Sequence, residues 1–266
     1  MFVRYSLGLV VLGFVACTSA PTETPLSRAR LEGMWSDPPS TAVGSFCFFS
    51  CTDMGVDRLN ALLDDPANDA RPFEQLQAEA AKYERENYFR PRLTDAALKT
   101  YPLDPADDPG FLRCEPWGLA RQMFAPHQLE IRQRGDDRIE LRYGEWDALR
   151  TVYLDGRTRP ANQAPGPLGH SVGHWDGETL VVETSGIAAN ITRWNAEHSD
   201  RLRAVERFAR SKDGDTLLLT ATLEDPWSLR EPVVLEKIWQ WAPDQQITSY
   251  DNCERPTEFS KGVSRP

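Results

Sequence analysis

The stretch GHSVGHWDGETLVVET, residues 169–184, predicts a β-hairpin that carries two of the chain's four histidines. An Asp-Gly pair between strand-forming residues is a strong hairpin signal, because a two-residue type I′ turn needs positive φ at both central positions. We place Asp176 and Gly177 at this turn. The register that follows sets His170 opposite Glu183.

Side chains alternate across a strand, so His170, His174 and Glu183 share one face of this hairpin. A histidine and a carboxylate in cross-strand contact could act in acid/base catalysis or bind a metal. The opposite face carries Trp175 and Leu180 and is an equally good candidate for the core. In that case the histidines face water or a neighbouring segment.

Alternating residues predict further strands on both sides of the hairpin. Across the loop at residues 135–137, one such pairing places His127 near Glu145. The remaining strands are expected at residues 149–154, 202–210, 217–223, 233–241 and 247–250. About nine short strands at this spacing predict a mainly β domain, an antiparallel meander that closes into a lipocalin-like barrel or a strongly curved sheet. A sandwich is the alternative.

An inward-pointing acid is expected at Glu206, because its neighbours on the same face of residues 202–210 and 217–223 are apolar. An apolar environment could raise the pKa of this carboxyl group and suit it to catalysis. A buried carboxylate also needs a partner, and Lys237 on the next strand or a nearby arginine could provide it. Structural pairing is the interpretation that we favour.

The part before the strands is expected to be helical and irregular and to pack on the β domain. Thr52 or Asp53 can cap a first helix, which Pro66 ends, and a second helix begins near residues 69–72. The expected divisions are a signal peptide 1–16, a tether 17–33, a helical part 34–125, a β domain 126–255 and a polar tail 256–266.

The first residues predict export. The apolar run 7–16 is too short to cross a bilayer, which takes about 20 residues, and fits the core of a secretion signal. It continues into FVAC, which resembles a bacterial lipoprotein signal and implies lipidation of Cys17. In that resemblance Thr18 implies the outer rather than the inner membrane of the envelope, facing the periplasm. Cleavage after Ala20 is the alternative.

Without Cys17 the chain keeps four cysteines, Cys47, Cys51, Cys114 and Cys253. An oxidising compartment would pair them, and of three connectivities we favour Cys47–Cys51 with Cys114–Cys253. A metal site is the rival interpretation, but a single Cys-x3-Cys pair supports it weakly.

The net charge of −10 argues against nucleic acid and anionic membrane surfaces as partners. No Gly-x4-Gly-Lys or Gly-x-Gly-x-x-Gly loop occurs, which argues against nucleotide use. A small-molecule ligand or substrate is the expected partner, and the membrane is reached only through the lipid anchor at Cys17. No cofactor is expected, with zinc as the alternative.

Zinc would use His170, His174 and His198, because three histidines with an open fourth position form a catalytic metal site. Trp175 and Trp194 could instead stack on a ligand together with His198 and Lys237, or they could pack in the core.

Four segments resemble a family of exported bacterial proteins and lipoproteins for which no activity is established. They are CEPWG at 114–118, VYLDGR at 152–157, the hairpin at 169–184 and VERF at 205–208. The resemblance covers roughly residues 112–255. It implies export and a single β domain, and it implies no reaction.

Three functions fit the sequence. We favour a lipid-anchored β-barrel that binds a small molecule at a polar site containing His170, His174, Glu183 and His198. An acid/base or metal-dependent enzyme, such as a hydrolase, lyase or isomerase, could use the same histidines. A structural envelope lipoprotein predicts scattered histidines and no cavity.

Overall fold

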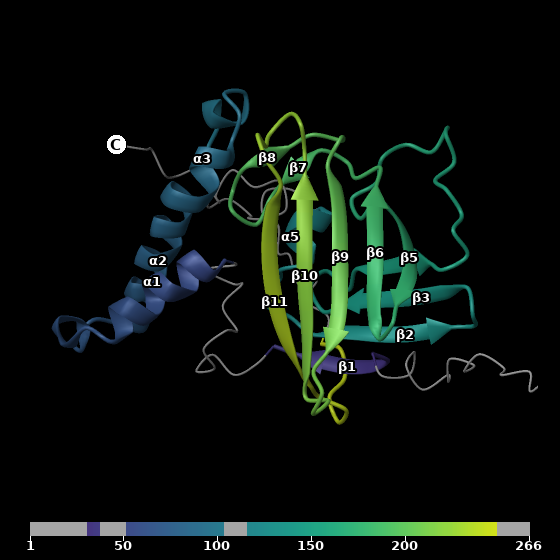
Figure 1. The fold of residues 1–266 in the computed structure, drawn as a ribbon, viewed down its shortest axis with the longest axis horizontal. Helices are drawn as coiled ribbons and strands as arrows, with labels where there is room; N and C mark the ends of the chain where they lie inside the picture. Colours follow the sequence, from purple (N-terminus) through teal and green to yellow (C-terminus); the bar gives the residue numbers. More distant parts are fainter. Residues whose placement is uncertain (1–30, 38–51, 104–115, 249–266) are drawn as a thin grey trace, which may run out of the picture.

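A computed structural model describes residues 31–37, 52–103 and 116–248. Within these residues, nine strands close into a barrel in the order β1-β11-β10-β9-β6-β5-β4-β3-β2 (Figure 1). They are β1 (Gly33–Ser36), β2 (Leu129–Arg134), β3 (Arg138–Tyr143), β4 (Leu149–Tyr153), β5 (His170–Asp176), β6 (Thr179–Ser185), β9 (Arg203–Arg210), β10 (Thr216–Glu224) and β11 (Val233–Trp241). The predicted mainly β fold with a closed barrel is confirmed.

Period-two alternation explains which residues face inward. In β9, β10 and β11 every second side chain is buried, as expected for strands with one face on a core. Strands β2 and β3 pair in the predicted register, with Leu129 opposite Tyr143. In the β9–β10 hairpin the register differs by two residues, so Glu206 lies opposite Ala221 rather than Leu219. A two-residue shift keeps each side chain on its predicted face.

One pair of strands is parallel, which corrects the prediction of a fully antiparallel meander. Val152 of β4 lies beside Ser171 of β5, and the two strands run in the same direction. Parallel neighbours cannot be joined by a tight turn and need a crossover of about a dozen residues or more. The connection 154–169 provides that crossover.

The barrel is closed by β1, which pairs with β2 on one side and with β11 on the other. The expected boundary between a tether and a helical part at residues 33 and 34 falls within this strand. Trp35 is fully buried, its indole N–H donates to the carbonyl of Leu31 at 2.9 Å, and its ring lies edge-on to Trp241. Gly33 adopts φ +134, beneath the Trp241 ring.

The helices precede the main run of strands. They are α1 (Asp53–Leu63), the 3-10 helix η3 (Pro66–Asn68), α2 (Phe73–Glu84), the π-helix η4 (Arg85–Phe89), α3 (Arg90–Arg92), the 3-10 helix η5 (Ala97–Lys99) and α5 (Leu119–Gln122). The Thr52 side chain caps α1 by accepting from Gly55 N, as predicted. Helices α1 and α2 share a small core of their own and project to the side of the barrel (Figure 1). No helix in the described ranges is long and apolar enough to cross a membrane.

The helical part packs on the barrel at the end where β11 begins. The Tyr88 hydroxyl exchanges hydrogen bonds with the backbone of Val234, and the Phe89 ring stacks on Trp194 at 4.7 Å. Trp194 belongs to the segment that forms a separate two-stranded sheet, β7 (Asn190–Ile191) and β8 (Glu197–His198). A final strand was predicted at residues 247–250. Residues 247–248 do not form a strand, and residues 249–250 lie outside the described residues.

Candidate functional site

The central hairpin turns one residue later than predicted. Asp176 pairs with Thr179, so Gly177 and Glu178 form the turn, and Gly177 has φ +59. A turn with Gly at its first central position and positive φ there alone is typical of type II′ rather than type I′. His170 consequently lies opposite Ser185, and the predicted contact between His170 and Glu183 is wrong.

The face that carries both histidines is the outer face of the barrel. His174 and Glu183 are exposed, whereas Leu180 and Val182 on the opposite face are buried. The alternative in which the histidines face outward is therefore correct. Glu183 lies directly opposite Val172, so the predicted direct pairing with a histidine is not formed in this register.

His170 contacts the long connection between β4 and β5. Its Nε2 donates to the carbonyl of Arg157 at 3.1 Å, and its ring stacks on Tyr153 with centroids 5.3 Å apart. The guanidinium of Arg157 lies 4.4 Å from the centre of the same Tyr153 ring. These contacts explain the position of His170 without any ligand.

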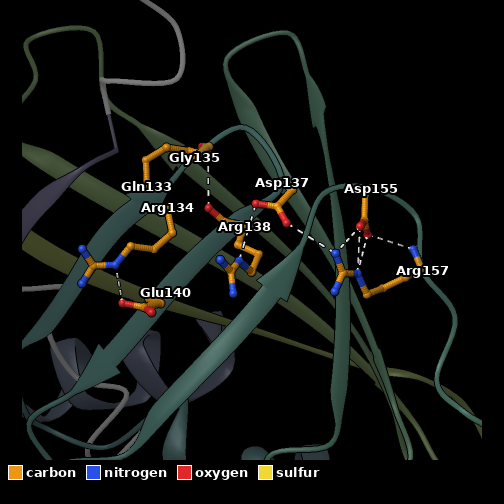
Figure 2. A network of polar contacts seen from close by, with 8 residues as sticks. All are labelled: Gln133, Arg134, Gly135, Asp137, Arg138, Glu140, Asp155 and Arg157. Atoms are coloured by element: carbon orange, nitrogen blue, oxygen red, sulfur yellow. Dashed lines mark hydrogen bonds and ion pairs between the residues drawn. The ribbon is translucent and has the colours of Figure 1, made fainter.

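Ion pairs link this connection to the β2–β3 loop (Figure 2). Arg157 pairs with Asp155 and reaches Asp137 at 3.4 Å, and Arg134 binds Glu140 at 2.7 Å. Hydrogen bonds from Arg157 lower the pKa of Asp155 to about 2. All these groups are solvent-exposed, and exposed pairs contribute little to stability. The network orders two loops and forms no enclosed site.

The barrel interior contains a charged network around Arg150, which the sequence analysis did not identify. The guanidinium binds both carboxylate oxygens of Glu206, one of them at 2.9 Å. It also donates to Ser171 Oγ at 2.8 Å, Thr184 Oγ1 at 2.6 Å and the Tyr143 hydroxyl at 3.4 Å. All five N–H groups of an arginine are thereby used.

Charge complementarity explains how this network is tolerated in a core. Burial is the largest influence on the pKa of Arg150 and lowers it, but Glu206 and Tyr143 together raise that pKa above its ordinary value. Burial raises the pKa of Tyr143 to about 12. Glu206 is therefore paired structurally, as favoured from sequence, and an arginine rather than Lys237 is its partner. The feature that could have identified Arg150 as an inward-facing residue is its position opposite Leu141, which faces the barrel interior.

Lys237 is buried at another place in the barrel. Its ammonium lies 3.1 Å from Asp37, donates to the carbonyl of Ala125 and sits 4.5 Å from the Trp239 ring. Burial lowers the pKa of Lys237. Burial also raises the pKa of its partner, Asp37. These contacts account for the buried ammonium, so the predicted ligand role of Lys237 finds no support.

The predicted approach of His127 to Glu145 is confirmed by an ion pair between them. His170, His174 and His198 do not come together. Within the described ranges no three His, Cys, Asp or Glu side chains form a group that could hold a metal ion. Cys17 and the four predicted disulfide positions, Cys47, Cys51, Cys114 and Cys253, lie outside the described residues.

His198 lines a pocket. The pocket has a volume of about 480 Å³, within the range of small-molecule sites. It is lined by Leu103, Ala189, Asn190, Ile191, Glu197, His198, Ser199 and Trp227. The β7–β8 sheet supplies half of these residues, and Trp227 comes from the β10–β11 connection.

The His198 imidazole is 2% exposed and has a fixed tautomer. Its Nδ1 lies 3.0 Å from the carbonyl oxygen of Ser199, which can only accept, so Nδ1 carries a proton. Burial lowers the pKa of His198, which favours the neutral ring. Nε2 is then an acceptor, and it has no hydrogen-bond partner among the described residues.

An aspartate holds the segment that carries His198. Asp225 accepts from the backbone N–H of Ser199 at 2.7 Å, the Ser199 hydroxyl at 2.7 Å and the Ser228 hydroxyl at 2.8 Å. These bonds outweigh burial and lower the pKa of Asp225. The turn at Asp225 is readable from sequence, since Asp commonly binds the backbone two residues on, as it does at Trp227 N.

The two tryptophans that were predicted to bind a ligand belong to the core. Trp194 is buried against Phe89, and Trp175 packs from the inner face of β5 against the main core. Trp227, another tryptophan considered from sequence as a possible ligand contact, does line the pocket, whereas sequence reasoning missed Glu197, because the pocket joins loops far apart in the chain.

A wider surface groove of about 850 Å³ lies on the other side of Asp225. Several of its charged residues have partners within the protein. Arg230 binds Asp95 at 2.7 Å, and Glu231 binds Arg92 at 2.9 Å. The groove therefore makes a weaker candidate site than the His198 pocket.

Comparisons with protein-family models, with curated proteins and with solved structures found no significant match.

Proposed function

We propose that this protein binds a small molecule in the pocket lined by His198. The observation that carries the proposal is a pocket of about 480 Å³ whose lining includes His198, a buried, neutral imidazole with an unpartnered and buried Nε2. A buried polar atom without a partner is costly, typically by about 1–3 kcal/mol, and rare in native proteins. A ligand donor would remove that cost.

The barrel supports the pocket rather than enclosing the ligand. Its interior is filled by large side chains such as Trp35, Phe208 and Trp239, and its buried arginine is fully hydrogen-bonded. Rigid sheets commonly carry binding sites on the loops at their ends. The His198 pocket has this arrangement.

A fragment screen by ligand-observed NMR tests the proposal. Ala189 is exposed and lines the pocket, so Ala189→Trp should block it while leaving the fold intact. Ala164→Trp, in the exposed β4–β5 connection, is the matched control. We expect hits that bind the wild type and the control but not Ala189→Trp. Hits that bind all three proteins equally, or no hits at all, would refute the proposal.

An acid/base enzyme is the second candidate. A neutral histidine with Nδ1–H held by a carbonyl and Nε2 free is the form that a general base needs. If this function holds, turnover of a bound molecule should follow a single ionisation and disappear in His198→Asn. Binding of the molecule without turnover would leave the binding function alone.

Export, a lipid anchor at Cys17 and membership of the exported bacterial family are further parts of the proposal. They rest on the first residues and on the four sequence segments. Mass spectrometry of the mature protein tests them. A lipidated N-terminus at Cys17, lost in Cys17→Ser, supports the anchor, whereas cleavage after Ala20 contradicts it. Non-reducing peptide mapping should join Cys114 to Cys253.

A further inference from the structure

The pocket indicates which class of molecule it takes, an inference that rests on the proposed binding function. Its described lining contains one carboxylate, Glu197, and no lysine or arginine. His198 is neutral because burial lowers its pKa, and Asp225 acts on it electrostatically from nearby. A pocket walled by negative charge attracts cations and repels anions.

The hydrogen-bonding atoms of the pocket point to the same class. Nε2 of His198 can only accept in the neutral ring, and Oε2 of Glu197 already accepts from Thr100 Oγ1 at 3.0 Å. The Ser199 hydroxyl is not free to donate, because it binds Asp225. A ligand that satisfies His198 and Glu197 must therefore bring N–H or O–H donors.

The rest of the wall is apolar except for the side-chain amide of Asn190, whose Oδ1 accepts from Ile191 N at 2.7 Å. Leu103, Ile191 and the half-buried Trp227 line it, and an indole face attracts a cation within about 6 Å of its centre. Nε2 of His198 is buried, so a ligand reaches it only after neighbouring atoms move aside.

We infer that the pocket takes a small organic ammonium ion with an apolar body. Its N–H groups donate to Nε2 of His198 and to the carboxylate of Glu197, and its body contacts Trp227 and Ile191.

Three probes with the same aromatic body test this inference by calorimetry on the full chain near neutral pH. They are 2-phenylethylamine, the neutral 2-phenylethanol and the anionic 3-phenylpropionate. We expect saturable one-to-one binding of the amine. The other two should bind at least about tenfold more weakly, the scale of one charge-assisted hydrogen bond.

Two Glu→Gln variants distinguish an effect at the pocket from an effect of surface charge elsewhere. Glu197→Gln should weaken amine binding about tenfold while the alcohol is unaffected. Glu183→Gln, on the exposed outer face of β6, should change neither affinity. Thermal unfolding of each variant establishes that it is folded.

The outcomes are distinct. The ammonium inference is overturned if the alcohol or the propionate binds as tightly as the amine, or if Glu197→Gln leaves the affinity for the amine unchanged. If Ala189→Trp still blocks binding of these probes, the proposed binding function of the pocket is retained. Failure of all three probes also overturns the inference, and the fragment screen then decides separately whether the pocket binds anything.

Discussion

Single residues decide where chemistry is available in this molecule. Arg150 and Glu206 are both charged and buried, yet each satisfies the other, and Ser171, Thr184 and Tyr143 take the remaining donors of the guanidinium. His198 is buried with an acceptor left over. The first arrangement stabilises the native barrel, and the second is the arrangement expected of a binding site.

Breaking the interior pair should be costly. Glu206→Gln leaves an arginine buried without its counter-charge, and such changes typically cost about 3–5 kcal/mol. The double variant Arg150→Met, Glu206→Leu should recover much of that loss, because an apolar pair leaves no buried charge. Urea unfolding measures both. A loss below about 1 kcal/mol in Glu206→Gln would contradict the paired arrangement.

His198 should make folding stability depend on pH. Its folded pKa is lowered by burial, with Asp225 opposing that shift and Glu197 as the other nearby charge. Below the ordinary histidine pKa of about 6.5, the unfolded chain therefore binds more protons at His198 than the folded protein does. The contribution of the neutral ring to stability is present above that pH and is lost as the pH falls. Between pH 7.5 and 5 the wild type should lose more unfolding free energy than His198→Asn. Equal losses would contradict a buried neutral ring.

At the scale of elements, alternation was predictable, whereas register was predicted correctly for β2–β3 but not for the β5–β6 and β9–β10 hairpins. The inner and outer faces of β5, β6, β9 and β10 follow from the period of two in their sequences. Each turn could form at adjacent positions, and the one-residue shift at Gly177 separated His170 from Glu183. The parallel pairing of β5 depends on the path of a long connection, which no local pattern specifies.

The β5–β6 hairpin provides a matched pair of histidine variants. His170→Ala removes a hydrogen bond and a ring contact and should cost about 0.5–1.5 kcal/mol of stability. Hydrogen exchange in residues 154–169 should speed up. His174→Ala, at an exposed position, should stay within about 0.5 kcal/mol. Neither variant should alter ligand binding, and loss of binding in either would restore the hairpin as a candidate site.

At the scale of the whole molecule, the barrel depends on a four-residue strand far from the others in sequence. β1 has too few residues to show an alternating pattern, so its role could not be predicted. The pocket was also beyond prediction, because Leu103, Glu197 and Trp227 meet only through the tertiary fold. His198 was identifiable as a candidate residue, but its burial was not.

Gly33 tests barrel closure. An added Cβ would lie 2.2 Å from the Trp241 ring, at a φ of +134 that other residues rarely adopt. Gly33→Ala should therefore destabilise the protein by clearly more than Gly156→Ala, which has φ +72 and open space around it. The control carries only the cost of positive φ, about 1–2 kcal/mol. Equal stability of the two variants would show that β1 does not close the barrel as described.

The most direct test of the central claim follows the imidazole nitrogens of His198 by NMR in labelled protein, assigned by comparison with His198→Asn, while 2-phenylethylamine is added. We expect a neutral ring with an unprotonated Nε2 whose resonance shifts saturably as the ligand binds. Ligand binding that leaves this resonance unchanged would contradict a binding site at His198.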